Sequence, residues 1–254
     1  MTAFADLHHR PGEPLLLPNA WDHASAAALA ARGFAAIGTT SLAVAAAVGL
    51  PDGAGVTAER TLRLALTLGA EPFLLSVDAE GGFGDDPECV AEFARTLWAA
   101  GAVGINLEDG LGPADLHAAK ISAVKRAAPG LFVNARTDTY WLGDGDEKDT
   151  LSRLDAYQQA GADGVFVPGV ADPERIATLV RRLDAPLNVL YSPTGPAVAH
   201  LADLGVRRIS LGSLLYRRAL GAALDAMDDI VGGRVPGGTT PSYDDVRALE
   251  RPGR

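Results

Sequence analysis

Asp78 and Glu80 follow the apolar run 73–77 and precede the glycine-rich turn 81–84. Residues two apart in a strand point to the same side, so both carboxylates can converge on one cation, and the glycines allow a backbone or a ligand to approach closely. Carboxylate oxygens are the ligands that hard divalent cations prefer. The spacing therefore indicates a cation site, although an isolated Asp-x-Glu more often marks a strand end followed by a solvated turn.

The same arrangement recurs at two later places in the chain. A second short apolar run ends in Glu108 and Asp109. A third run ends in Arg136, with Asp138 beside it. The arginine fork matches the geometry of a carboxylate or a phosphate. Three strand ends that carry acids and an arginine predict a shared site for a divalent cation and an anionic substrate.

The composition is that of one globular domain without a nucleic-acid or anionic-membrane partner. The chain has 254 residues, of which 48% are hydrophobic, so it can bury one large core, and its single cysteine excludes a disulfide framework. The net charge is −10 and the pI is near 4.9, which leaves no basic stripe to neutralise phosphates. Basic pairs such as Arg207-Arg208 are interpreted as solvated helix faces or strand ends.

Targeting and zinc chemistry have no clear signal in the sequence. No apolar run approaches the roughly 20 residues needed to span a bilayer, and the N-terminus lacks a signal peptide's basic start and apolar core, so we expect a cytoplasmic protein. The histidines show no paired zinc spacing, and His8 and His9 are expected at the surface. Cys89 is interpreted as a small apolar residue of a helix rather than a catalytic thiol.

Short β-like runs alternate with longer Ala/Leu-rich helical runs along the chain. Strands are predicted at 15–18, 35–40, 73–80, 104–109, 131–137, 164–168, 186–191 and 208–212. Helices are predicted at 22–32, 57–69, 87–100, 114–128, 147–160, 173–183, 196–204 and 213–231. Asp-Pro pairs at 86–87 and 172–173 begin helices, and glycines such as Gly101 end them.

Eight βα units predict an α/β fold of the (β/α)8 TIM-barrel type, whose strands are buried on both faces and read as apolar runs. We expect a single domain over residues 1–231 and a C-terminal tail, 232–254, that packs on the barrel or on a neighbouring subunit. A doubly wound open sheet is the alternative, but no Gly-x-Gly-x-x-Gly opens a helix after the first strand.

The C-terminal strand ends of a TIM barrel carry its active site. The acids and the arginine described above fall at these ends, together with Thr39, Thr40 and Ser41 after the second strand. Hydroxyl and backbone N–H groups around Thr40 and Ser41 could bind a carboxylate, and an ordinary turn is the alternative.

Five motifs in the chain resemble those of the isocitrate lyase/phosphoenolpyruvate mutase family. Within this family, the chain is most similar to the members that resemble 2-methylisocitrate lyase. The motifs are Gly33-Phe34 through Ile37, Gly49-Leu50-Pro51-Asp52, Val77-Asp78-Ala79-Glu80-Gly81-Gly82-Phe83-Gly84, Gly104-Ile105-Asn106-Leu107-Glu108-Asp109 and Asn134-Ala135-Arg136-Thr137-Asp138. Each motif alone is of moderate specificity, but the five occur in the family's order. The similarity runs from about residue 14 to residue 220.

The resemblance implies a barrel enzyme that uses Mg²⁺ and binds 2-oxo acids or their 2-hydroxy precursors. The enzyme would stabilise the enolate that forms when a C–C or P–C bond of such an acid breaks. By position, it implies Asp78, Glu80 and Glu108 as the metal shell, directly or through water. An all-oxygen ligand set fits Mg²⁺, with Mn²⁺ as the alternative. Such a cation supplies Lewis-acid stabilisation worth several kcal/mol.

The resemblance also implies roles for residues that bind the substrate. It implies that Arg136 and the Thr40-Ser41 segment hold the substrate carboxylate, and that Asp52 lies near the metal and the substrate. A competing route through a lysine Schiff base is disfavoured, because no lysine stands at a predicted strand end.

The loop after the fourth strand departs from the family. Residues 110–117 contain neither the Lys-x-Cys-Gly-His-like motif of the isocitrate and 2-methylisocitrate lyases nor the lysine and asparagine of the P–C enzymes' gating loop. Water or another side chain must then protonate the enolate, and Tyr140, Tyr191 and His117 are candidates.

These observations predict a Mg²⁺-dependent carbon–carbon lyase, of decarboxylase or retro-aldol type, that acts on a small 2-oxo or 2-hydroxy dicarboxylic acid. The alternatives are a P–C bond hydrolase or mutase acting on phosphonopyruvate, and a binding protein for 2-oxo acids without turnover. The resemblance further implies a homo-oligomer, a tetramer or a dimer, in which the last helix, near 213–231, exchanges between subunits. The apolar residues of that helix could equally close a monomer's barrel.

Overall fold

The structure, a computed structural model, describes residues 2–10 and 12–250, and its centre is a sheet of nine parallel strands in the order β1-β9-β8-β7-β6-β5-β4-β3-β2. Strands β1 (Leu15–Leu17) and β2 (Asn19–Ala20) are separated by one residue, Pro18, which has no N–H group to donate to a ladder. Strand β1 pairs with β9 and β2 pairs with β3, so the first predicted strand joins the two ends of the sheet. The predicted TIM barrel is thereby confirmed.

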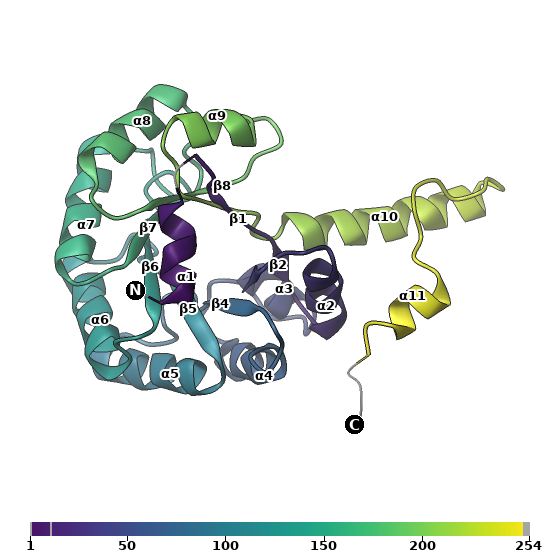
Figure 1. The fold of residues 1–254 in the computed structure, drawn as a ribbon, viewed down its shortest axis with the longest axis horizontal. Coiled ribbons are helices and arrows are strands. Elements are labelled where there is room, and N and C mark those ends of the chain that lie inside the picture. Colours follow the sequence, from purple (N-terminus) through teal and green to yellow (C-terminus); the bar gives the residue numbers. More distant parts are fainter. Residues whose placement is uncertain (1, 11, 251–254) are drawn as a thin grey trace.

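The remaining strands and their covering helices alternate as predicted. The strands are β3 (Ala36–Thr39), β4 (Leu74–Asp78), β5 (Ala102–Glu108), β6 (Phe132–Arg136), β7 (Gly164–Val167), β8 (Leu187–Leu190) and β9 (Arg208–Ser210). The helices around them are α2 (His23–Ala31), α4 (Ala58–Leu68), α5 (Pro87–Ala99), α6 (Ala114–Ala127), α7 (Glu147–Gln159), α8 (Pro173–Arg182) and α9 (Val198–Asp203) (Figure 1).

Local signals fix where these helices begin and end. The Asp86 and Asp172 side chains accept hydrogen bonds from the N–H groups of Glu88 and Arg175, at 3.0 and 2.9 Å. Gly101 has φ +101°, and a Cβ there would lie 2.3 Å from the Gly69 carbonyl oxygen, so only glycine fits this turn into β5.

The N-terminal segment covers the opening of the barrel at the start of the strands. Helix α1 (Ala3–Asp6) and the 3₁₀ turn η1 (Leu7–His9) lie across this opening (Figure 1). His8 is 1% exposed and its ring stacks on Phe132 at 4.3 Å between centroids, so the expectation that it lies at the surface is wrong. Burial lowers the pKa of His8 to about 3, because the charged form is poorly solvated there.

Helix α10 (Leu214–Val231) leaves the barrel instead of covering it (Figure 1). None of its residues is buried, and Leu220, Leu224, Met227 and Ile230 are each more than half exposed. Beyond it lies the short α11 (Tyr243–Arg247), and the last tail residues, 251–254, lie outside the described residues. In the described ranges, no helix is both long enough and apolar enough to cross a membrane.

Candidate active site

A cavity of about 210 Å³, here called the strand-end pocket, opens at the C-terminal ends of the barrel strands. Thr40, Ser41, Asp52, Asp78 and Arg136 line it together. The structure thus brings residues from four distant stretches of sequence into one place. The cavity lies at the end of the barrel that carries the catalytic residues in TIM-barrel enzymes.

A second cavity, here called the loop cavity, has a volume of about 390 Å³ and lies between the loops that follow β4 and β5. Glu80 and Glu108 line this cavity, whereas Asp78 lines the strand-end pocket. The three acids predicted to bind metal therefore lie at the ends of adjacent strands but line two different cavities.

Asp78 is held by the neighbouring strand end. Its backbone N–H donates to Thr39 Oγ1 at 2.9 Å, and its Oδ2 accepts from the Ser41 N–H at 3.1 Å. Ser41 begins α3 (Ser41–Ala46), a short helix that the sequence prediction treated as part of a turn. Thr39 is 2% exposed and lies outside the pocket lining, so its hydroxyl positions Asp78 from below.

Arg136 forms the centre of an ion-pair cluster at the end of β6. Its Nη1 lies 2.7 Å from Glu108 Oε2, and its Nη2 lies 2.6 Å from Asp138 Oδ1. Burial opposes the charge of Arg136, but the carboxylates of Glu108, Asp138 and Asp78 outweigh it and hold its pKa above the ordinary value. The guanidinium is therefore charged and fixed in place.

Glu108 lies among negative charges. Burial raises its pKa to about 8; the Arg136 charge opposes this shift, and the nearby carboxylates of Asp78, Asp138 and Glu80 add to it. Such crowding of acids is relieved when a cation binds among them.

Glu80 is buried and held by the loop before α4. It is 2% exposed, its φ is +48°, and its carboxylate accepts hydrogen bonds from the Thr57 hydroxyl and from the Gly55 N–H, the latter at 3.1 Å. Sequence reasoning missed Thr57, which gives no signal beyond its place at a helix start. The loop 53–57 is thereby fixed beside the acids.

The carboxylates at these strand ends offer oxygen donors of the kind that a partly hydrated Mg²⁺ ion takes in proteins. In the described part of the chain, no three His, Cys, Asp or Glu side chains are arranged as a ready metal cluster. Magnesium retains several waters and binds through one or two carboxylates, so Asp78 could coordinate it directly, with Glu80 and Glu108 acting through water.

Asp52 enters the strand-end pocket on the loop before α4. Burial raises the pKa of its carboxyl group, a contact with Ser41 lowers it, and the charge of Asp78 raises it further. A carboxyl group with a raised pKa beside a charged arginine is suited to proton transfer.

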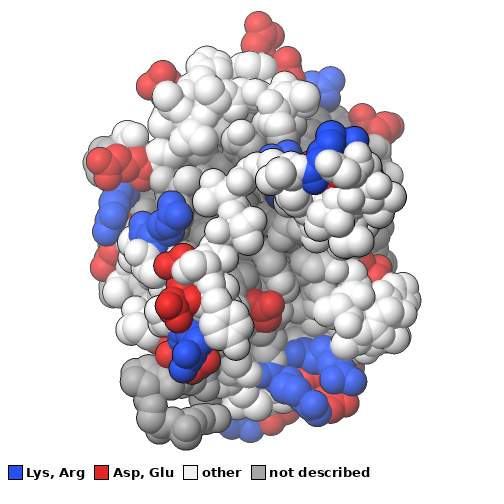
Figure 2. Space-filling model, turned by 90° about the vertical axis from the view of Figure 1, so that its right-hand side faces the viewer, with Lys and Arg blue, Asp and Glu red and all other residues white. Residues whose placement is uncertain are grey.

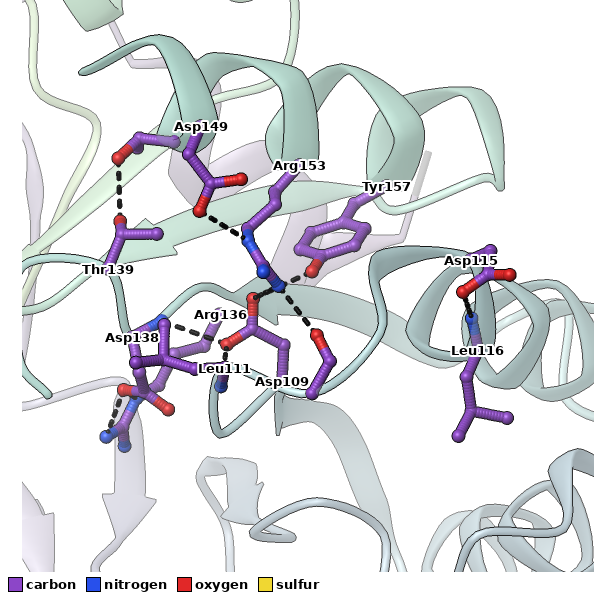
Figure 3. A network of polar contacts seen from close by, with 12 residues as sticks. Asp109, Leu111, Asp115, Leu116, Arg136, Asp138, Thr139, Asp149, Arg153 and Tyr157 are labelled. Carbon is purple, nitrogen blue, oxygen red and sulfur yellow. Dashed lines mark hydrogen bonds and ion pairs between the residues drawn. The ribbon is translucent and has the colours of Figure 1, made fainter. Parts of the chain in front are cut away.

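Asp109 lines the loop cavity and not the strand-end pocket. Its carboxylate joins the loops that follow β5 and β6 (Figure 3). Its carboxylate accepts from the Tyr157 hydroxyl at 2.7 Å, from Arg153 at 3.2 Å and from the Asp138 N–H at 3.1 Å. Burial opposes its charge, but the hydrogen bonds from Leu111, Tyr157 and Asp138 hold its pKa below the ordinary value. Asp109 is a structural anion that holds Asp138 next to Arg136.

The three candidate proton donors lie in different places. Tyr191 lines the strand-end pocket. The Tyr140 hydroxyl lies 3.4 Å from Arg175, outside this pocket. His117 lines the loop cavity, and burial lowers its pKa to about 4, so it is neutral near pH 7. Of the three, only Tyr191 is placed to reach a ligand in the strand-end pocket.

Comparison with known proteins assigns the family. The family model described as phosphoenolpyruvate phosphomutase matches residues 4–231. The chain belongs to this family. The resemblance seen in the five sequence motifs is therefore confirmed, and with it membership of the isocitrate lyase/phosphoenolpyruvate mutase superfamily, whose members are C–C lyases or mutases that act on small organic acids.

Relatives of this phosphoenolpyruvate mutase family member span most of its length. An uncharacterized protein of Mycobacterium tuberculosis is 46% identical over 230 residues, which cover 88% of this chain and 87% of the relative. The 2-methylisocitrate lyase of Bacillus subtilis is 31% identical over 203 residues, covering 74% and 66%. A Burkholderia cenocepacia structure described as a candidate lyase/mutase superposes with a TM-score of 0.88 at 37% identity, covering 98% and 95%.

Proposed function

We propose that the protein is a Mg²⁺-dependent lyase that cleaves a C–C bond of a small 2-oxo or 2-hydroxy dicarboxylic acid through an enolate. The observation that carries this proposal is the convergence of Asp52, Asp78 and Arg136 in one pocket, with Glu80 and Glu108 at the adjacent strand ends. Oxygen donors for a hard cation and a fixed guanidinium for a carboxylate are what such a substrate requires.

Each residue has a part in this chemistry. When bound by Asp78, Glu80 and Glu108, Mg²⁺ would act as a Lewis acid toward the charge that develops on the substrate. Arg136, held by Glu108 and Asp138, would orient the substrate carboxylate. Asp52, whose pKa is raised by burial, would accept or return the proton that moves as the bond breaks.

The short loop 110–113 affects which type of bond cleavage the site can support. It leaves the loop cavity open beside Glu80 and Glu108, and within residues 110–117 no cysteine is present to act as an acid. Water can enter the site through the loop cavity, and Tyr191 lines the strand-end pocket on the opposite side of the acids. This arrangement suits decarboxylation or a retro-aldol cleavage in which water or a side chain protonates the enolate.

Variants of Asp78 test the proposal. Asp78→Asn removes the charge that would hold the cation, and we expect metal-dependent turnover to fall by about 100-fold or more, while Asp172→Asn at the start of α8 leaves it unchanged. Calorimetric titration of oxalate in Mg²⁺ and in EDTA supplies a second readout. Binding by the wild type that is equally tight in EDTA would contradict the role of the metal.

We propose further that the protein is a homo-oligomer joined through α10. The helix exposes Leu220, Leu224 and Met227 along one face, and the side of the molecule from which it projects has few charges over its centre (Figure 2). An apolar groove along α2, lined by residues that include Trp21 and Leu29, could receive the same helix of a partner. A partner's α10 would then complete the barrel domain over 1–231.

A further inference from the structure

A layer of polar side chains lies inside the barrel, beneath the strand-end pocket. Arg208, the first residue of β9, is 1% exposed. Its Nη2 donates to Asn106 Oδ1 at 3.1 Å, and its Nε donates to Ser210 Oγ at 3.1 Å. Because β5 and β9 are not neighbours in the sheet, the Arg208 side chain must cross the barrel interior to reach Asn106.

Arg208 differs from Arg136 in having no paired carboxylate. Both of its hydrogen-bond partners are neutral, and its Nη1 is buried without a partner among the described residues. Arg136, in contrast, contacts two carboxylates. A buried cation with only neutral partners is costly. The negative charge of Asp78 favours the charged form of Arg208 without contacting it, and an anion bound in the pocket would favour that form further.

Arg208 fixes the orientation of the Asn106 amide. A guanidinium can only donate, so the side-chain oxygen of Asn106 must face it, and the Asn134 amide donates to the same oxygen at 2.8 Å. The Asn106 Nδ2 must then point the other way. Asn106 lines the strand-end pocket, and its Nδ2 has no hydrogen-bond partner among the described residues. This nitrogen is not one of the fully buried atoms that lack a partner, so a ligand in the pocket can reach it.

The same logic fixes the Ser210 hydroxyl. Its oxygen accepts from Arg208 Nε and from Asn188 Nδ2, at 3.1 and 3.0 Å, which uses both lone pairs. Its proton has no acceptor among the described residues, and Ser210 lines the strand-end pocket. The hydroxyl proton is therefore free for a ligand in the pocket.

We propose that Asn106 and Ser210 form a subsite for a carboxylate oxygen, and that Arg208 is the positioning residue that makes both groups donors toward the pocket. The subsite lies at the pocket floor and is separate from Arg136. This subsite rests on the proposed function, because that function supplies a ligand with two carboxylates. Its two hydrogen-bond donors would let a pocket lined by the acids Asp52 and Asp78 bind a dianion.

The first test compares two hydroxyl deletions inside the barrel. Ser210→Ala removes the pocket-facing donor, whereas Ser76→Ala removes a hydroxyl that is equally buried, has no partner and lies outside the pocket lining. Acetate and oxalate are titrated calorimetrically in the presence of Mg²⁺. We expect Ser210→Ala to weaken carboxylate binding about 10- to 100-fold, the range for a hydrogen bond to a charged group, and Ser76→Ala to bind as the wild type does.

The second test replaces the amide donor of Asn106 by a carboxylate and keeps Arg208, because the loss of Arg208 could prevent folding. Asn106→Asp gives Arg208 a carboxylate partner, so we expect a melting temperature no lower than that of the wild type. The new carboxylate also replaces the donor that faces the pocket. Carboxylate binding should therefore fall more than in Ser210→Ala, although the protein is at least as stable.

The outcomes separate this inference from the proposed function. If small carboxylates bind in a way that depends on Ser210 but no 2-oxo or 2-hydroxy acid is cleaved, the subsite stands and the lyase proposal fails. If acids are cleaved but Ser210→Ala and Asn106→Asp bind oxalate like the wild type, the subsite is refuted and the lyase proposal stands. Wild-type protein that binds neither acetate nor oxalate also refutes the subsite.

Discussion

Replacement of Tyr157 by phenylalanine tests the buried cluster that holds the loops of the site. Tyr157 is fully buried, and its hydroxyl donates to Asp109 Oδ2 at 2.7 Å, while the Asp109 side chain is 0% exposed (Figure 3). Tyr157→Phe keeps the packed ring and removes only this donor. Loss of a hydrogen bond to a buried charged acceptor costs about 1.5–3 kcal/mol.

The assay is equilibrium unfolding of Tyr157→Phe beside a matched control. In a chain of this length, 1 kcal/mol corresponds to about 2–4 °C, so the melting temperature should fall by roughly 3–12 °C. Tyr140→Phe removes a hydroxyl whose contact with Arg175 is exposed and 3.4 Å long, and we expect it to change the free energy of unfolding by less than about 0.5 kcal/mol.

The pH dependence of this difference follows from Asp109. Its pKa in the folded protein lies below the ordinary value of 3.8, so its stabilising effect is present above that pH and is lost as the pH falls through the folded pKa. The difference between wild type and Tyr157→Phe should therefore shrink in acid. Equal stability of Tyr157→Phe, Tyr140→Phe and the wild type at neutral pH would refute the structural role of Asp109.

Four further predictions concern the site and the assembly. Asp52→Asn should lower kcat by about 100-fold and change oxalate affinity only slightly, and an equal loss of both would contradict a role in proton transfer. Because the pKa of Glu108 is raised to about 8, binding of Mg²⁺ beside it should release its proton, and calorimetry should show an Mg²⁺ affinity that rises about tenfold per pH unit below that value; a flat profile would count against a part for Glu108 in the metal site. The same shift means that metal-free protein loses stability as the pH rises from 4.5 to about 8, because the folded form holds that proton more tightly. Leu224→Glu should dissociate the oligomer in sedimentation, whereas Leu66→Glu, equally exposed at 59%, should not, and an unchanged mass for Leu224→Glu would exclude α10 from the interface.

The barrel could be predicted from the sequence because its signals are local. Parallel barrel strands are continuous apolar runs, and Asp-Pro starts and glycine stops bound the helices between them, so the predicted and observed elements nearly coincide. The N-terminal segment gave no such signal. A helix of four residues, Ala3–Asp6, is too short for periodicity, and the burial of His8 against Phe132 joins residues far apart in the chain.

The site could be predicted in part for the same reason. Strand ends place Asp78 and Arg136, but the direction of each side chain depends on partners from other loops, such as Thr57 for Glu80. The sequence interpretation assigns the Arg207-Arg208 pair to a solvated helix face or a strand end, at the start of the predicted strand 208–212. The period of two in a strand puts Arg208 and Ser210 on one face, and that face proves to be the barrel interior.

Metal-dependent cleavage of a C–C bond is tested most directly by product analysis. The purified protein is incubated with oxaloacetate, substituted malates, 2-methylisocitrate and phosphonopyruvate, each with Mg²⁺ and with EDTA, and products are followed by NMR. We expect a product from at least one carbon substrate in Mg²⁺ and none above the uncatalysed rate in EDTA. Turnover of phosphonopyruvate alone, or metal-dependent binding of these acids without any product, would contradict it.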